Sequence, residues 1–164
     1  MEKAVMAEMI SYFGADVRRI NHALKVHAFA SLLGAQEGLS SGELYTLSLA
    51  ALLHDIGIRE AERKYHSSAG KYQEIEGPPV AREILLKCGV PEREHARILH
   101  LIGNHHSYAK IDGKDFQLLV EADFLVNIYE DQMEPAATKS AVAKYFKTDS
   151  GRRLAFSMYP CAGG

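Results

Sequence analysis

The sequence predicts an all-α protein, a single compact bundle of about six to seven helices. Apolar residues recur at helical spacing over most of the 164 residues. No segment alternates apolar and polar residues in the way that a half-buried strand does. The chain is long enough for one domain with a hydrophobic core, and the sequence contains no repeat or low-complexity stretch.

Two helices are expected at the start of the chain. Residues 2–13 place apolar side chains on one face, and Gly14 ends this helix. Asp16 is suited to cap the next helix, which we expect over residues 17–33. Gly34 stops it.

A buried helix is expected next. Ser40 and Glu43 have the spacing of a capping box, which opens a helix that runs to about Leu53. Residues 47–53 are almost all apolar, so this helix should be central rather than amphipathic. Polar residues directly after it are therefore carried into the interior.

The remainder of the chain is predicted as one loop, three helices and two lesser helices. Residues 57–76 are polar and irregular, and we expect a loop there that includes a turn of helix at most. Loops of this length inside compact domains are usually functional or disordered. The helices are expected over residues 79–88, 91–104, 114–130, 135–146 and 150–158.

Composition narrows the classes of partner and location. The net charge of −2 gives no electrostatic basis for a nucleic-acid polymer or an anionic membrane as the main partner. Cys88 and Cys161 belong to no motif, which suits a reducing compartment. Residues 1–12 lack the apolar core of a signal peptide, and no apolar run approaches the ~20 residues of a membrane span. We therefore expect a cytoplasmic protein.

Several polar residues fall where the interior is expected. His54 and Asp55 follow the apolar helix directly, and burying such a pair costs several kcal/mol unless it is paired or bound to a metal. Asp123 lies within an apolar helix and needs a cation, either a metal ion or an arginine. His22 lies in the middle of a helix, where, taken alone, a capped or surface histidine is the favoured explanation.

Taken together, these four residues come from three predicted helices. Two imidazoles and two carboxylates make a mixed site that suits divalent Mn, Fe, Co, Ni or Zn, with Mg as an alternative. Side chains from facing helices are a known way to build a metal site in a bundle core. One ion is expected, and a second is left open.

The resemblance to a known family lies in an ordered set of residues. These are His22 with Arg19 and Val26 around it, then Leu52-Leu53-His54-Asp55-Ile56-Gly57, then the pair His105-His106, then Asp123. The set resembles the HD-domain superfamily of metal-dependent phosphohydrolases over about residues 16–130. We expect one domain of this type over residues 1–164.

The resemblance implies a fold, a cofactor and an activity. It implies an all-helical protein in which His22, His54, Asp55 and Asp123 bind a divalent metal. The implied reaction is the hydrolysis of a small phosphate ester, as a phosphomonoesterase or a phosphodiesterase, by attack of metal-bound water. The substrate class includes nucleotides but is not resolved further.

Two departures from the family pattern affect the second metal and the substrate. Members with two metals carry a histidine where this chain has Gln73, so His105 is as well suited to contact substrate phosphate as to bind a metal. Glu74 and Glu76 are the alternative ligands. The Gly-Tyr-Pro motif of cyclic-dinucleotide phosphodiesterases is missing after His106, so that substrate is not assigned.

The remaining roles concern the attack on phosphorus and the binding of phosphate. Asp55, or a carboxylate of the following segment such as Glu62 or Glu76, is expected to orient or deprotonate the water. The expected phosphate-binding residues are Arg19, Arg59, Arg63, Lys64 and His105. For each of the cations, a solvated surface position is an equal alternative.

Two other functions stay open. One is a non-catalytic module that binds a nucleotide or a metal as a signal, and the other is a diiron oxygenase of the same family. A second ion would favour the oxygenase. The remaining histidines, His27, His66, His95 and His100, are interpreted as structural, and the oligomeric state is left open.

Overall fold

The computed structural model describes residues 1–163, whose regular elements are all helical. There are nine α-helices and two short 3₁₀-helices in this part of the chain: α1 (Glu2–Phe13), α2 (Val17–Gln36), α3 (Ser41–Leu53), α4 (Ile58–Tyr65), α5 (Gly70–Lys87), α6 (Glu92–Ile102), η1 (Tyr108–Lys110), α7 (Lys114–Glu130), α8 (Pro135–Tyr145), α9 (Asp149–Met158) and η2 (Pro160–Ala162). The all-α prediction is confirmed, whereas the predicted number of helices was too low.

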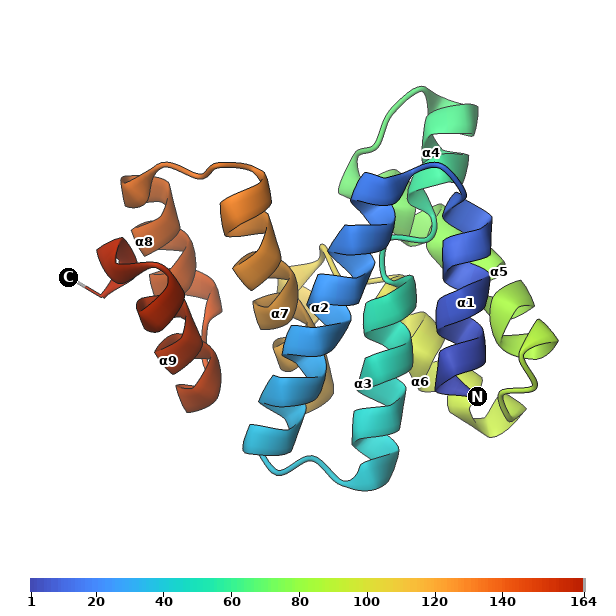
Figure 1. Ribbon diagram of the computed structural model, residues 1–164, viewed down its shortest axis with the longest axis horizontal. Helices are drawn as coiled ribbons and strands as arrows, with labels where there is room; N and C mark the ends of the chain where they lie inside the picture. Colours follow the sequence, from blue (N-terminus) through green and yellow to red (C-terminus); the bar gives the residue numbers. More distant parts are fainter. Residues whose placement is uncertain (164) are drawn as a thin grey trace.

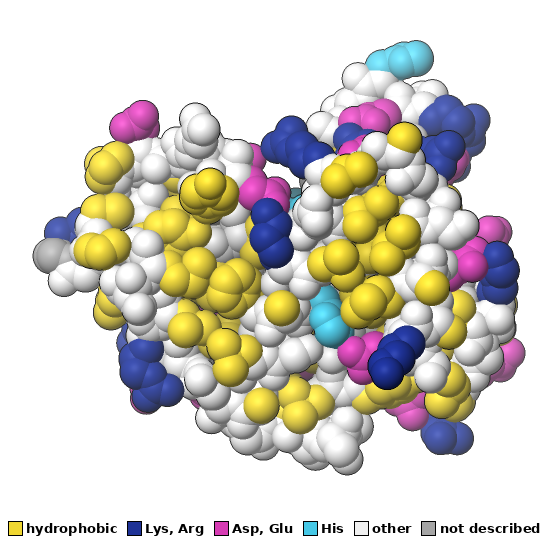
Figure 2. Space-filling view, in the orientation of Figure 1, with side chains coloured by type: hydrophobic (Ala, Val, Ile, Leu, Met, Phe, Trp, Pro, Cys, Tyr) yellow, Lys and Arg dark blue, Asp and Glu magenta, His cyan; other side chains and the backbone are white. Residues whose placement is uncertain are grey.

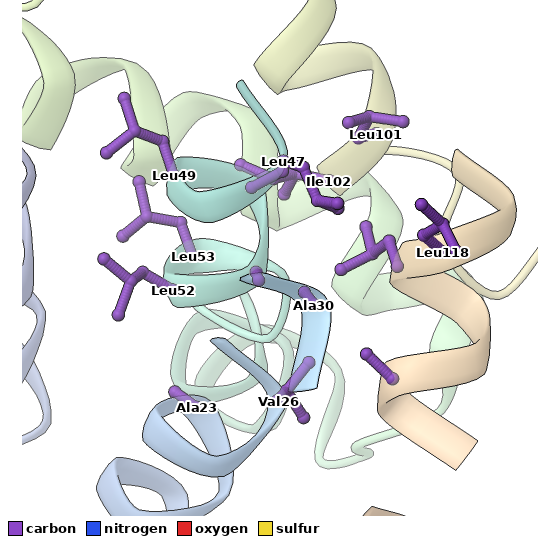
Figure 3. Packing of buried hydrophobic residues seen from close by; sticks show 14 of the residues in the cluster. Ala23, Val26, Ala30, Leu47, Leu49, Leu52, Leu53, Leu101, Ile102 and Leu118 are labelled. Atoms are coloured by element: carbon purple, nitrogen blue, oxygen red, sulfur yellow. The ribbon is translucent and has the colours of Figure 1, made fainter. Parts of the chain in front are cut away.

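Helices α2, α3 and α7 form the centre of the molecule (Figure 1). Figure 3 shows Val26 and Ala30 of α2 and Leu47 of α3 in one cluster with Leu118 of α7. Helix α3 is buried from residue 46 to residue 53, which confirms the expected central helix. Helices α1, α5 and α6 lie on one side of this centre, and α8 and α9 lie on the other (Figure 1).

The predicted caps form. The Asp16 side chain accepts a hydrogen bond from the backbone N–H of Arg19 at 3.2 Å, which begins α2. Ser40 and Glu43 make both bonds of the capping box at the start of α3. These local signals place the first turns of the two helices that deliver His22 and His54.

The prediction of a loop over residues 57–76 was wrong. Helix α4 and the first two turns of α5 occupy most of this segment. Helix α4 buries Ala61 and part of Ile58, and its polar character comes from the charged face that it turns to solvent. The connection that remains is short, and it begins at His66 in a left-handed conformation with φ 53°.

Helix α5 also begins earlier than predicted, and Pro78 and Pro79 lie inside it rather than at its start. Proline lacks an N–H, but its fixed φ is close to the helical value. The lost backbone hydrogen bonds are offset by the burial of Gln73, Gly77 and Ala81 against neighbouring elements.

The C-terminal helices are tied to the centre through a buried carboxylate. Glu121 of α7 is fully buried and accepts hydrogen bonds from the backbone N–H groups of Lys147 at 2.6 Å and Thr148 at 2.9 Å. This contact holds the connection between α8 and α9 against α7. Over residues 1–163, no helix combines the length and apolar character that crossing a membrane requires.

Candidate metal centre

Three neighbouring helices bring the predicted metal-ligating residues to one place. His22 lies in the second turn of α2, and Asp123 lies in the middle of α7. His54 caps the C-terminus of α3, and Asp55 lies in the turn that follows. Since α2 packs against both α3 and α7, the four side chains meet between these helices.

The donor atoms of this cluster lie close to one another. Nε2 of His22 is 3.1 Å from Nε2 of His54, 3.2 Å from Oδ1 of Asp123 and 3.5 Å from Oδ2 of Asp55. Nε2 of His54 is 3.6 Å from the same two carboxylate oxygens. Donors bound to one Zn²⁺-sized ion at about 2.1 Å would lie roughly 3.0–3.4 Å apart. The spacing therefore fits a single transition-metal ion.

The second ring nitrogen of each histidine shows why a cation is needed here. Nδ1 of His54 donates to the Ala51 carbonyl at 2.8 Å, and Nδ1 of His22 donates to Oε2 of Glu130 at 3.0 Å. In the neutral rings both Nε2 atoms are then bare acceptors. They face two carboxylate oxygens. Four acceptor atoms repel one another at these distances unless a metal ion or protons lie between them.

Glu130 was missed by the sequence analysis, although its position contains a signal. It lies two turns after Asp123 on α7, so the two carboxylates share a helix face. Lys25 of α2 forms an ion pair with the other oxygen of Glu130. Asn127, between them, donates to Oδ1 of Asp123 at 2.9 Å.

The charges of the cluster shift the pKa values of its members. Burial lowers the pKa of His54, but the Asp55 and Asp123 carboxylates outweigh burial and raise this pKa to about 9. The pKa of His22 is raised against burial by its contact with Asp123. Burial raises the pKa of Asp55 and of Asp123, but the adjacent imidazoles hold both well below the usual range.

A second group of ligating side chains shares Asp55. Oδ1 of Asp55 is 3.3 Å from Nε2 of His105, and Nδ1 of His105 donates to the Ile102 carbonyl at 2.8 Å. His106 completes this group. Its pKa falls to about 4 because the ring is buried beside His105, so the imidazole is neutral at physiological pH.

Gln73 stands beside His106 in the structure. Its Oε1 lies 3.5 Å from Nε2 of His106, and its Nε2 donates to the Ser68 carbonyl at 2.7 Å. Gly70 leaves room for the imidazole, because a Cβ atom there would lie 2.7 Å from the His106 ring. The second group therefore offers two imidazoles, a shared carboxylate and an amide oxygen.

Glu74 and Glu76, the alternative ligands for a second metal, accept hydrogen bonds from other groups. Glu74 accepts from the backbone N–H of His106 at 3.0 Å. Glu76 accepts from Lys64 at 2.5 Å and from the Tyr65 hydroxyl at 3.0 Å. Neither belongs to the two ligating groups formed by residues 1–163. Glu76, which we expected to act on the attacking water, therefore contacts Lys64 and Tyr65 rather than the candidate metal ligands.

The predicted phosphate-binding residues are dispersed. Arg19 lines the cavity beside the cluster, where it pairs with Glu62 at 2.5 Å and with Asp16 at 2.8 Å. Arg59 donates to the Tyr12 carbonyl at 2.6 Å, away from the cavity lining. His105 lies in the second group, and Lys64 pairs with Glu76 as described above.

A cavity of about 410 Å³ opens onto the candidate metal ligands His22 and Asp55. Figure 2 shows cationic and acidic side chains gathered around the hollow between the end of α7 and the start of α2. The lining residues are Asp16, Arg18, Arg19, His22, Asp55, Ile58, Ser68, Asn127, Glu130 and Asp131. This volume lies within the range of small-molecule sites. Arg18, Ser68 and Asp131 were not singled out from the sequence.

Three of the four remaining histidines have local side-chain contacts. His27 pairs with Glu2 at 2.7 Å, and His100 lies 3.1 Å from Asp112. His95 donates through Nε2 to the Val90 carbonyl at 2.9 Å. His66 lies at the end of α4.

The comparisons with known proteins give one match. A family model described as HD domain matches residues 19–147, which include both ligating groups. No curated protein and no solved structure matches the chain.

Proposed function

The chain belongs to the HD domain family, and from this premise we propose that it is a metal-dependent phosphohydrolase acting on a small phosphate ester. One observation carries the proposal. The Nε2 atoms of His22 and His54 lie within 3.1–3.6 Å of each other and of one oxygen each from Asp55 and Asp123, beside a cavity large enough for a small molecule. In this proposal His22, His54, Asp55 and Asp123 hold the divalent ion.

The donor set indicates which ions fit. Two imidazole nitrogens and two carboxylate oxygens suit Mn, Fe, Co, Ni or Zn in the divalent state. When bound, such an ion supplies Lewis acidity toward a phosphoryl oxygen and lowers the pKa of coordinated water.

Asp55 is the residue that we propose to assist the attack on phosphorus. It lines the cavity, and its two oxygens face different partners, the histidines of the first group and His105. Nε2 of His105 is bare when Nδ1 donates to Ile102, so the short contact with Asp55 needs a proton or a second ion between the two atoms. Asp55 and His105 can thereby hold a proton next to the reacting groups.

The test combines metal content with phosphate release. We expect His54→Ala and Asp123→Ala each to lose bound metal and to reduce phosphate release by at least about 100-fold. His27→Gln is the control, since His27 pairs with Glu2 outside the cluster. Elemental analysis and a phosphate-release screen with each divalent metal measure both quantities. Full metal content and activity in both alanine variants would show the proposal to be wrong.

A dinuclear centre is a second candidate, because Asp55, His105 and His106 form a second ligating group. The Gln73 side chain offers an amide oxygen there rather than an imidazole. Two irons per chain together with O₂ uptake would favour an oxygenase. Two ions with phosphate release would favour a dinuclear phosphohydrolase, and nucleotide binding without turnover would indicate a regulatory module.

A further inference from the structure

We propose that the substrate carries a single phosphate group on a neutral, hydroxyl-bearing remainder, and that Arg18 binds this phosphate at the cavity mouth. The inference rests on the proposed function and narrows its substrate class. The charges that line the cavity limit the substrate, and the partners of each cation decide what that cation can still bind.

Two of the cations in or beside the cavity wall are already paired. Arg19 donates to both oxygens of Glu62, at 2.5 and 3.2 Å, and lies 2.8 Å from Asp16. Lys25 is paired with Glu130. A phosphate that bound either side chain would have to displace a carboxylate.

Arg18 differs from these cations. Its side chain is 77% exposed, and its carboxylate contact, with Asp131, spans 3.8 Å between two exposed side chains. Such a pair is weak in water. Arg18 also lines the cavity that holds His22 and Asp55, so its guanidinium is free to fork onto phosphate oxygens.

The charge balance limits how many phosphates the cavity accepts. Six carboxylates lie in the cavity wall or contact it directly, and three cations accompany them. The carboxylates are Asp16, Asp55, Glu62, Asp123, Glu130 and Asp131, and the cations are Arg18, Arg19 and Lys25. One divalent ion leaves this set with a net negative charge. Each phosphate beyond the one at the ion is therefore repelled.

The remaining polar atoms suit a hydroxyl-bearing group. Asn127 uses its amide nitrogen to donate to Asp123, which leaves its carbonyl oxygen as an acceptor in the cavity wall. Asp131 adds an exposed carboxylate nearby. Both accept hydrogen bonds from sugar or polyol hydroxyls, and neither attracts further phosphate.

The first experiment compares esters that differ in phosphate number alone. Protein loaded with Mn²⁺ is assayed with adenosine monophosphate, diphosphate and triphosphate, with the ion in excess of the nucleotide. We expect kcat/KM for the monophosphate to exceed that for the triphosphate by at least about tenfold. An equal or higher kcat/KM for the triphosphate would overturn the inference.

The second experiment tests Arg18 against a matched arginine. We expect Arg18→Gln to raise KM for the monophosphate about tenfold with little change in kcat, because the lost contact binds substrate and transition state alike. Arg93→Gln is the control, since its side chain is 80% exposed and has one carboxylate neighbour on α6. Equal effects of the two variants would overturn the role of Arg18. Asp131→Asn should lower the preference for monophosphate over triphosphate severalfold, and an unchanged preference would contradict the charge argument.

The outcomes separate this inference from the proposed function. If metal-loaded protein turns over no ester, the phosphohydrolase proposal fails, and the same three nucleotides are then compared by calorimetry. Tighter binding of the monophosphate would support the charge argument for a non-catalytic module. Equal or tighter binding of the triphosphate would overturn it.

Discussion

His22 and His54 each commit one ring nitrogen to a neighbour, and this commitment decides what the other nitrogen can bind. His54 uses a backbone carbonyl of its own helix, whereas His22 depends on the side chain of Glu130. Such partners fix the tautomer and orientation of a metal-ligating histidine. We therefore infer that Glu130 is a positioning residue that acts through His22.

We predict that Glu130→Ala weakens Mn²⁺ or Zn²⁺ binding by about 10- to 100-fold, because the His22 ring loses its orienting acceptor. Competition with a fluorescent chelator measures this affinity without reference to activity. Glu134→Ala is the matched control, since Glu134 is an exposed glutamate just beyond the end of α7. An affinity within threefold of the unmodified protein would contradict the positioning role.

At the scale of elements, the turn after α3 is pressed against α5. A Cβ atom on Gly57 would lie 2.4 Å from the backbone nitrogen of Gly77 and 2.6 Å from the Gln73 carbonyl oxygen. This close approach brings α5, which carries Gln73, beside the turn that carries Asp55. Backbone atoms cannot move aside as a flexible side chain can, so the crossing requires glycine.

Gly57→Ala is accordingly expected to lower the free energy of unfolding by about 1–3 kcal/mol or more, through overpacking. Gly42→Ala provides the contrast, since Gly42 lies in α3 and its added Cβ would meet no atom within 4 Å. That variant should be more stable by about 0.5–1 kcal/mol. Urea denaturation measures both, and equal effects of the two changes would contradict the packing argument.

For the whole molecule, the buried side chains of His54, Asp55 and Asp123 make the stability of the fold depend on pH. In metal-free protein the pKa of His54 is raised from 6.5 to about 9, so the folded state binds this proton more tightly than the unfolded chain does. The resulting stabilisation is fully present below pH 6.5 and is lost as pH rises through about 9. Asp55 and Asp123 act oppositely: their lowered pKa values stabilise the fold above pH 3.8, and this is lost in acid.

We therefore predict that the urea midpoint of metal-free protein falls between pH 6.5 and 9. Bound metal should reduce this fall, because the ion replaces the protons on the histidines. His54→Gln should reduce it as well, since the residue with the raised pKa is then absent. A constant midpoint across this range in metal-free protein would contradict the assigned pKa shift.

Local sequence patterns predicted much of the helical framework, but the prediction for residues 57–76 was wrong. Local sequence was enough to predict the caps at Asp16 and Ser40 and the apolar run of α3, because these features depend only on neighbouring residues. The segment that holds α4 reads as a loop because its charged face dominates the composition. The helical state of this segment depends on the packing of α4 against α5, and of α5 against α1 and α6, which cannot be seen in the residues of the segment alone.

What the sequence determined by itself was the helical class and the residues that need a cation, since both follow from the order of apolar and polar residues. His54 and Asp55 end an apolar run, and Asp123 interrupts another. Only the tertiary structure decided which atoms face one another. It placed Glu130 behind His22, paired Glu76 with Lys64, and left Arg18 facing the cavity. These relations join residues from different helices, and their distances depend on how whole helices pack.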